Sequence, residues 1–178
     1  MKKIIDKNGN SVNVSDQGTI HPVLYPKHYA KTTSCSCKTL NVGIINKSQN
    51  PLPEYAHIGD SGMDLLANED GRLFAGQSAI IGTGLFVAIP EGNKIQIRSK
   101  SGLAEKHGLI PITGTIDSNY RGELKVVLLN TGRKSFDCVI GSKIAQMVLC
   151  PVIKMELKVV DKLYETTRGE AGFGSTGS

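Results

Sequence analysis

The stretch Thr113-Gly-Thr-Ile-Asp-Ser-Asn-Tyr-Arg-Gly-Glu-Leu124 places one carboxylate, Asp117, in a turn-rich segment between two apolar runs. Leu109–Ile112 precedes this segment and Val126–Leu129 follows it. Because its glycines and its Ser-Asn pair are turn formers, the pattern predicts a tight hairpin with Asp117 near its mouth. An Asp in such a turn most often serves only as a cap, so the rest of the chain decides whether Asp117 does more.

The chain outside this segment has the pattern of an all-β protein. Short runs with strand character recur between Gly and Pro residues, at positions 40–45, 79–81, 85–89, 94–98, 144–149 and 155–159. Many short strands joined by turns predict a β-barrel or a sandwich. One segment, Ser101–His107, predicts a short helix that begins at a capping hydroxyl and stops at Gly108.

Length and composition suit a single domain with a sizeable core, since the chain has 178 residues. No apolar run approaches the ~18 residues that span a bilayer. The Lys2-Lys3 start is not followed by the apolar stretch of a secretory signal. We therefore expect a soluble, intracellular protein of the cytoplasm that does not bind membranes.

The net charge of +5 is unevenly distributed along the chain. Residues 1–38 carry six Lys and two Asp, a balance of +4, which leaves the remainder close to neutral at +1. A near-neutral domain in which aromatic residues make up 5% of the chain does not indicate a nucleic-acid-binding surface.

Residues 1–38 are predicted to be an N-terminal extension of unknown role. An Asn-Gly pair within Ile4–Val12 predicts a β-hairpin there. The extension either packs on a partner subunit, binds another protein or stays mobile. Four of its residues are potential metal ligands whose spacing fits no standard pattern: His21, His28, Cys35 and Cys37. The other two cysteines, Cys138 and Cys150, lie in apolar runs and are predicted to be small core residues.

The segment Lys100-Ser101-Gly102 places a cation and a hydroxyl at the start of the predicted helix. Free N–H groups and the helix dipole favour an anion at this end, and Gly102 lets a phosphate approach the backbone. An ordinary helix cap with a solvated Lys is the alternative.

The tail Arg168-Gly-Glu-Ala-Gly-Phe-Gly-Ser-Thr-Gly-Ser178 is rich in glycine but contains one Arg and one Phe. It nearly spells a Walker phosphate loop, but Ser175 stands where that motif has Lys, which argues against a P-loop NTPase. A flexible lid is the better interpretation, with Arg168 for phosphate charge and Phe173 to stack on a base. Backbone N–H groups, Ser175 and Thr176 would then bind oxygens. A disordered tail would explain the glycines but not the Phe.

Two further segments combine polar side chains with apolar neighbours. Gly59–Leu65 offers Asp60 and Asp64 around a turn, and Mg²⁺ is usually held by one or two carboxylates together with substrate phosphates. Gly141–Met147 places Gln146 in an apolar run, either as an edge residue or as a ligand of phosphate or water. An ordinary turn is the alternative for Gly59–Leu65.

Taken together and in this order, the five segments resemble those of the trimeric dUTP pyrophosphatases (dUTPases) over residues 39–178. Residues 114–123 and 168–177 carry the most specific part of the resemblance. The resemblance implies a jelly-roll-like β-barrel over residues 39–160, with one short helix and a Gly-rich lid over 161–178. It also implies a homotrimer with shared active sites and Mg²⁺ as the cofactor. The implied reaction converts dUTP to dUMP and pyrophosphate, which keeps uracil out of DNA and supplies dUMP for dTMP synthesis.

At the positions that match the family's motifs, the resemblance implies roles for individual residues. Asp117 would be the general base that activates a water for in-line attack on the α-phosphorus. Tyr120 would pack on the deoxyribose and exclude a 2′-hydroxyl, and Asp64 would hold Mg²⁺ through water. The implied phosphate-binding residues are Lys100, Ser101, Gly102, Gln146, Arg168, Gly174, Ser175 and Thr176. The implied uracil-binding residues are Gly114, Thr115, Ile116 and Lys125 of the hairpin, and Phe173, which would stack over the base.

Two positions depart from the family pattern. Lys100 stands where the family usually has Arg, which keeps the charge but loses the planar, bidentate fork. Pro111 stands where many members have an Asn that contacts uracil. Neither change removes the general base.

Two alternative functions compete with hydrolysis of dUTP. The related dCTP deaminases carry a catalytic Glu at the position of Val127, and a valine cannot shuttle protons to a cytosine amino group. A non-enzymatic role, in which nucleotide binding switches contact with a partner protein, is opposed by the intact Asp117, Tyr120 and Phe173.

Overall fold

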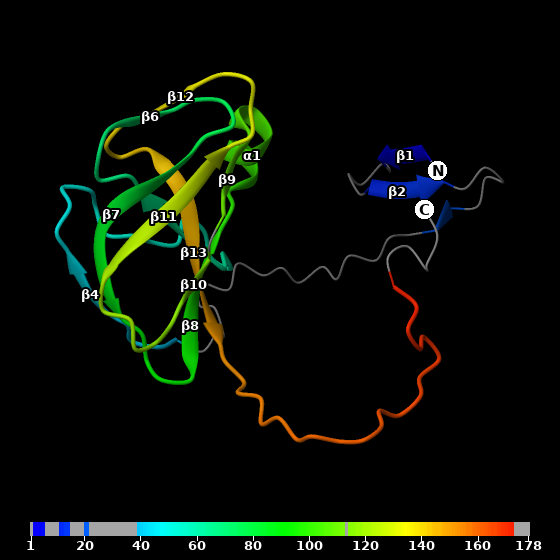
Figure 1. Ribbon diagram of the computed structural model, residues 1–178. Helices are drawn as coiled ribbons and strands as arrows, with labels where there is room; N and C mark the ends of the chain where they lie inside the picture. The colour runs from blue at the N-terminus through cyan, green and yellow to red at the C-terminus, as the bar shows by residue number, and fades with distance from the viewer. Residues whose placement is uncertain (1, 6–10, 15–19, 22–38, 113, 173–178) are drawn as a thin grey trace. The chain divides into compact units, whose positions relative to one another are not determined.

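The computed structural model describes residues 2–5, 11–14, 20–21, 39–112 and 114–172, with side chains from residue 39 onward. The chain divides into two compact units, one of Met1–Leu40 with His57–Gly59 and one of Asn41–Ala56 with Asp60–Ser178. The first unit contains an antiparallel three-stranded sheet of β1 (Lys2–Ile5), β2 (Ser11–Val14) and β3 (Ile20–His21) (Figure 1). Ile5 pairs with Ser11, so the hairpin predicted from the Asn-Gly pair is confirmed at its strands.

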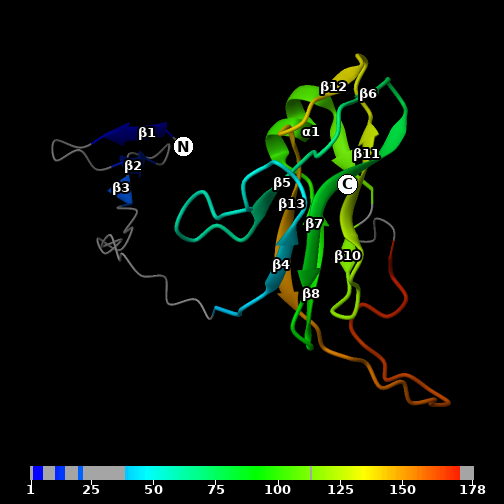
Figure 2. The ribbon, with the colours of Figure 1, turned by 90° about the vertical axis from the view of Figure 1, so that its left-hand side faces the viewer.

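The second unit is built from two four-stranded sheets and a two-stranded ribbon, all antiparallel (Figure 1 and Figure 2). The first sheet has the order β10 (Thr115–Ile116), β8 (Asn93–Arg98), β13 (Lys143–Pro151), β5 (Met63–Leu66). The second has the order β4 (Gly43–Asn46), β7 (Ser78–Ala88), β11 (Glu123–Asn130), β9 (Leu109–Pro111). The ribbon pairs β6 (Gly71–Leu73) with β12 (Phe136–Cys138). The predicted all-β class with one short helix is confirmed, although the sheets do not close into a barrel.

The core lies between the inner faces of these strands. Burial alternates along strand β11, with Leu124, Val126 and Leu128 completely buried. Leu65 of β5 and Ile144 of β13 are also completely buried, so both four-stranded sheets contribute to one core. Each such side chain stabilises the fold by about 1.5–3 kcal/mol relative to an exposed position.

Helix α1 (Ser101–His107) has the predicted bounds and the predicted C-terminal stop. Gly108 adopts the left-handed conformation (φ 67°, ψ 25°), and its N–H bonds to the carbonyl of Ala104. The predicted Ser101 cap is wrong. Lys100 is the N-cap residue and makes no side-chain cap, while its carbonyl accepts the N–H groups of Leu103 and Ala104.

Residues 78–88 form one strand, β7, rather than two strands separated by Gly82-Thr83-Gly84. The glycines do not end the strand because β11 shifts its register opposite them, between Glu123 and Lys125. Thr83 secures this bulge through its hydroxyl, which donates to the Leu124 carbonyl at 2.7 Å. A bulge admits extra residues into a paired strand without ending it.

The segment before the Asp117 turn differs from a simple tight hairpin. Strand β9 pairs with the far end of β11, with Pro111 opposite Leu128, as a hairpin requires. Strand β10 instead pairs with β8 of the other sheet, where Ile116 lies opposite Ile95. The chain therefore crosses from one sheet to the other before it reaches Asp117.

The strand expected over residues 155–159 is wrong for the single chain. Residues 152–172 form no helix or strand (orange to red in Figure 1), and Met155 and Val159 are 86% and 97% exposed. A strand forms only where backbone partners are available on a sheet edge, and alternation of side chains alone does not supply them. None of the helices in the described part of the chain has the length and hydropathy needed to cross a membrane.

Candidate functional site

Backbone and side-chain hydrogen bonds stabilise the turn that contains Asp117. The N–H of Tyr120 donates to the Asp117 carbonyl at 3.1 Å, which closes the turn. The Arg121 guanidinium donates to the carbonyls of Ser118 at 2.6 Å and of Tyr120 at 2.8 Å. These bonds fix the backbone that carries Asp117 and Tyr120.

The strand that leads into this turn needs glycine at position 114. The N–H of Ile97 donates to the Gly114 carbonyl at 2.7 Å, so the two backbones are in direct contact. A Cβ at position 114 would lie 2.8 Å from the Ile97 carbonyl oxygen, closer than carbon and oxygen atoms normally approach. Gly114 therefore sets the path of Thr115 and Ile116 into the turn.

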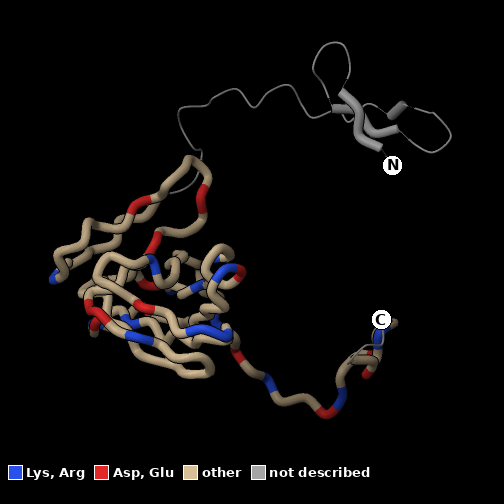
Figure 3. Tube along the Cα trace, turned by 90° about the horizontal axis from the view of Figure 1, so that it is seen from above, with Lys and Arg blue, Asp and Glu red and all other residues tan. Residues whose placement is uncertain are grey.

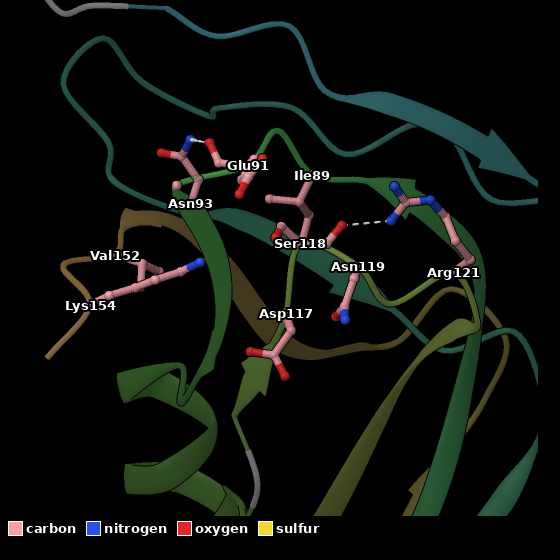
Figure 4. Close-up of a pocket in the computed structure, with 10 residues that line it drawn as sticks. Ile89, Glu91, Asn93, Asp117, Ser118, Asn119, Arg121, Val152 and Lys154 are labelled. Carbon is pink, nitrogen blue, oxygen red and sulfur yellow. Dashed lines mark hydrogen bonds between the residues drawn. The ribbon is translucent and has the colours of Figure 1, made fainter. Parts of the chain in front are cut away.

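Asp117 lies at an open cavity of about 460 Å³ (Figure 4). Its walls are formed by the turn, by the connection between β7 and β8, and by residues after β13: Ile89, Glu91, Gly92, Asn93, Asp117, Ser118, Asn119, Arg121, Val152 and Lys154. The Asp117 side chain is exposed and points away from the Arg121 guanidinium. Among the residues that the structure describes, its carboxylate has no hydrogen-bond or ion-pair partner.

A second group of predicted residues meets around Asp64 on β5. The Lys100 ammonium contacts Asp64 Oδ1, and the Lys143 ammonium lies 2.8 Å from Asp64 Oδ2. Asp64 and Lys100 are only 26% and 27% exposed. Burial raises the pKa of the Asp64 carboxyl, but hydrogen bonds and charge from the two lysines lower it by more, so that the pKa lies below its usual value. Asp64 is thus held as a carboxylate between two cations.

Gln146 belongs to the same group. It pairs with Asp64 on one side of β13 and with Arg98 on the other. Its amide nitrogen donates to the Ser99 carbonyl at 2.9 Å. A Cβ at Gly62 would lie 2.6 Å from Gln146 Oε1, so the glycine leaves room for this side chain. Lys100, Gln146 and Asp64 therefore lie together at one end of β8.

Sequence reasoning missed Lys143, which shares Asp64 with Lys100. The signal available was a basic residue three positions before Gln146 in the same polar segment. The sequence does not show that this residue reaches Asp64, because the contact depends on the pairing of β13 with β5. Ser101 and Gly102 are exposed at the start of α1.

Asp64 is the carboxylate that the family resemblance implies for Mg²⁺. In the described part of the chain, no three His, Cys, Asp or Glu side chains are arranged so that they could hold a metal ion together. Asp64 supplies one carboxylate, and both of its oxygens already face ammonium groups. One carboxylate acting through water, with phosphate oxygens as direct ligands, is a usual arrangement for Mg²⁺.

The single chain does not bring the two groups together. Ile116, next to Asp117, pairs with Ile95 near the start of β8, whereas Lys100 follows the end of that strand at Arg98. Lys100 comes five positions after Ile95, which corresponds to roughly 16 Å at about 3.3 Å per strand residue. Asp117 and the Lys100 group therefore occupy opposite ends of β8.

The tail is described only as far as residue 172. Arg168, predicted to bind phosphate, donates from Nε to the Ala171 carbonyl at 2.9 Å within a turn of the tail itself. Phe173, Gly174, Ser175 and Thr176 lie outside the described residues, as do the side chains of His21, His28, Cys35 and Cys37. Cys138 is buried as predicted and Cys150 is half-buried, and neither forms a disulfide.

Known proteins match this chain over most of its length. A family model described as dUTPase matches residues 48–177. The deoxyuridine 5'-triphosphate nucleotidohydrolase of Gloeothece citriformis (strain PCC 7424) is 49% identical over 128 residues, which are 71% of this chain and 88% of the relative. The enzyme of the same name from Clostridium tetani (strain Massachusetts / E88) is 45% identical over 141 residues, 78% of this chain and 97% of the relative.

Solved structures agree with these matches. The dUTPase of Staphylococcus bacteriophage 80alpha with dUpNHpp is 30% identical with a TM-score of 0.73, over 79% of this chain and 100% of that chain. A dUTPase from phage phi11 of S. aureus, described with a structural Mg(II) ion, is 26% identical with a TM-score of 0.65, over 71% of this chain and 100% of that chain. By its family model, its relatives and its fold, the chain belongs to the dUTPase family.

Proposed function

We propose that this enzyme hydrolyses dUTP to dUMP and pyrophosphate, with Asp117 as the general base. The observation that carries the assignment is the contrast between the two carboxylates of the candidate site. Asp64 is occupied by two lysines, whereas Asp117 is exposed at a cavity and makes no hydrogen bond or ion pair with another described residue. A general base needs an uncommitted oxygen that can reach the proton it removes.

In the proposed step, an Asp117 oxygen accepts a proton from a water as that water attacks the α-phosphorus in line. A new bond forms between the water oxygen and the α-phosphorus. The bond from the α-phosphorus to the oxygen bridging the α- and β-phosphates breaks, and its electrons leave with pyrophosphate. Such transfer depends on positioning and charge neutralisation rather than on a covalent nucleophile.

The triphosphate would be bound by the group around Lys100. Its ammonium, the Ser101 hydroxyl, the Gly102 backbone and the Gln146 amide offer donors at one end of β8. Lys143 adds a second ammonium beside Asp64. Mg²⁺, held by the phosphates and through water by Asp64, would neutralise charge on the triphosphate. Arg168, Gly174, Ser175 and Thr176 of the tail are proposed to close over the γ-phosphate.

The nucleoside would lie against the Asp117 turn. Tyr120, 43% exposed, offers a ring face to the deoxyribose and leaves no room for a 2′-hydroxyl. Backbone groups of Gly114, Thr115, Ile116 and Lys125 are proposed to read the uracil edge, with Phe173 stacking over the base. The Ile97 N–H donates to the Gly114 carbonyl, so the backbone that would bind the uracil edge is held in place.

A homotrimer with shared active sites would join the two separated halves. Asp117 and the Lys100 group lie at opposite ends of β8, so one chain cannot present both to one nucleotide. After β13, alternate residues from Ile153 to Val159 are apolar and strongly exposed, although their pattern is that of a strand. A sheet edge on another copy would supply the partner that this segment lacks. We propose that the enzyme works in the cytoplasm.

The test is release of pyrophosphate from dUTP, dTTP, dCTP and UTP with Mg²⁺, with the product nucleotides identified. Rapid release from dUTP alone, giving dUMP, is the expected result. Absence of release from dUTP by a correctly folded protein would refute the proposed activity. Deamination of dCTP would instead revive the deaminase alternative, which Val127 opposes.

A further inference from the structure

The bulge of β7 lies against the start of β11, directly after the Asp117 turn. Gly84 has a left-handed backbone (φ +70°), and the register of the two strands shifts between Glu123 and Lys125. The backbone N–H groups at such a bulge do not all find partners in the ladder. Here side chains provide two of the acceptors.

Two carboxylates bind the N–H groups of the bulge. Gly82 N–H donates to Glu69 Oε1 at 2.9 Å, and Gly84 N–H donates to Glu123 Oε1 at 2.8 Å. A Cβ at Gly82 would lie 2.6 Å from Glu123 Oε1, so the Glu123 carboxylate sits tightly over the bulge. Lys125 adds a weaker contact, with its ammonium 3.6 Å from Glu123 Oε2.

Glu123 differs from Glu69 because its backbone also holds Tyr120. The Tyr120 hydroxyl donates to the Glu123 carbonyl at 3.1 Å. The ring lies so close to Gly122 that a Cβ there would be 2.2 Å from the Tyr120 hydroxyl oxygen. The position of this ring thus depends on the backbone of residues 122 and 123. No hydrogen bond or ion pair joins Glu69 to Tyr120 among the described residues.

We propose that Glu123 is a positioning residue for discrimination between deoxyribose and ribose. Its carboxylate anchors the start of β11 to the Gly84 N–H, and its carbonyl, fixed by that anchor, holds the Tyr120 hydroxyl. Tyr120 then stays close enough to the sugar to exclude a 2′-hydroxyl. Loss of the carboxylate lets the carbonyl and the ring move away, and UTP enters. This inference rests on the proposed function, because it takes Tyr120 to contact the sugar of the substrate.

The measured quantity is the ratio of kcat/KM for dUTP to kcat/KM for UTP, in the full-length protein with Mg²⁺. For Glu123→Ala we expect this ratio to fall by roughly tenfold, because small displacements of a positioning group are costly. Glu123→Gln keeps an acceptor oxygen for Gly84 and should retain most of the ratio. Melting temperature is measured for every variant, and Glu123→Gln remains informative if Glu123→Ala does not fold.

The matched control is Glu69→Ala, which removes a carboxylate from the same bulge without a link to Tyr120. A purely structural effect lowers kcat/KM for both nucleotides by the same factor, so the ratio for Glu69→Ala should stay within about twofold of wild type. Tyr120→Phe removes the hydroxyl, and its effect on the ratio should not add to that of Glu123→Ala, since both break one chain of contacts.

The outcomes separate this proposal from the proposed function. If the wild-type protein hydrolyses dUTP but Glu123→Ala keeps the wild-type ratio, the positioning role is refuted and the activity stands. The role is also refuted if Glu69→Ala changes the ratio as much as Glu123→Ala does. If the folded wild-type protein does not hydrolyse dUTP, the proposed function itself fails.

Discussion

Asp64 and Asp117 are the two carboxylates of the candidate site, and their surroundings differ. Asp64 is partly buried on a strand and held between two lysines, so its charge is neutralised within the chain. Asp117 is exposed on a turn whose backbone is tied by Tyr120 and Arg121, while its own carboxylate has no partner among the described residues. Figure 3 shows that acidic and basic residues are otherwise interspersed in the second unit. The arrangement around Asp64 suits the binding of charged groups, and the arrangement around Asp117 suits proton transfer.

Asp117→Asn should have the largest effect, because an amide cannot accept the proton from the attacking water. We expect kcat for dUTP to fall by roughly 10³-fold or more, since general-base catalysis contributes about 10²–10⁴-fold. Binding of dUTP, measured by calorimetry, should be nearly unchanged, because the substitution keeps the size of the side chain. Substantial turnover by the purified variant would contradict the contrast between the two carboxylates.

Lys100→Ala and Lys143→Ala test the role of the two lysines around Asp64. Loss of a charged hydrogen bond to phosphate costs about 1.5–3 kcal/mol, so kcat/KM for dUTP should fall by roughly 10–100-fold for Lys100→Ala. The effect of Lys143→Ala should be smaller, because Lys143 is 60% exposed and more strongly screened by water. Lys100→Arg is the control, since it keeps the charge and adds a planar fork. Equal losses for Lys100→Ala and Lys100→Arg would show that charge is not what Lys100 supplies.

The smallest expected effect is that of Asp64→Asn on the free energy of unfolding at acid pH. Burial raises the pKa of Asp64 but the two lysines lower it by more, so the folded pKa lies below the unfolded value of about 3.9. The resulting stabilisation is present above that value and is lost as pH falls below about 4 through the folded pKa. The difference in free energy of unfolding between wild type and Asp64→Asn should therefore shrink as pH falls from 7 to about 3.

Asp137→Asn provides the comparison for acid stability. Arg72 lowers the pKa of Asp137 through a hydrogen bond, but this pair is exposed to solvent. Exposed pairs contribute little to stability, so its pH-dependent difference should be smaller than that of Asp64→Asn. Urea unfolding at a series of pH values measures both, and a larger pH-dependent difference for Asp137→Asn would contradict the partly buried character assigned to the Asp64 group.

Local pattern in the sequence was sufficient for features that depend on neighbours along the chain. The alternation of Ile95 and Ile97 with polar residues over 94–98 predicts a half-buried strand, because successive side chains of a strand point to opposite faces, and both isoleucines are buried on β8. The end of α1 at Gly108 follows from the left-handed conformation that glycine adopts without strain. The order of the five polar segments also indicated the family and its candidate residues, including Asp117.

Features that depend on pairing between distant segments were decided only by the tertiary structure. Residues 78–88 stay one strand because β11 adapts its register to their glycines, and residues 155–159 pair with no described strand of the same chain. Lys143 reaches Asp64 only because β13 pairs with β5. The sequence indicated candidate residues such as Asp64, Lys100 and Asp117, because side-chain chemistry is local. The fold determined which of them meet, because hydrogen bonds between strands join positions far apart in the chain.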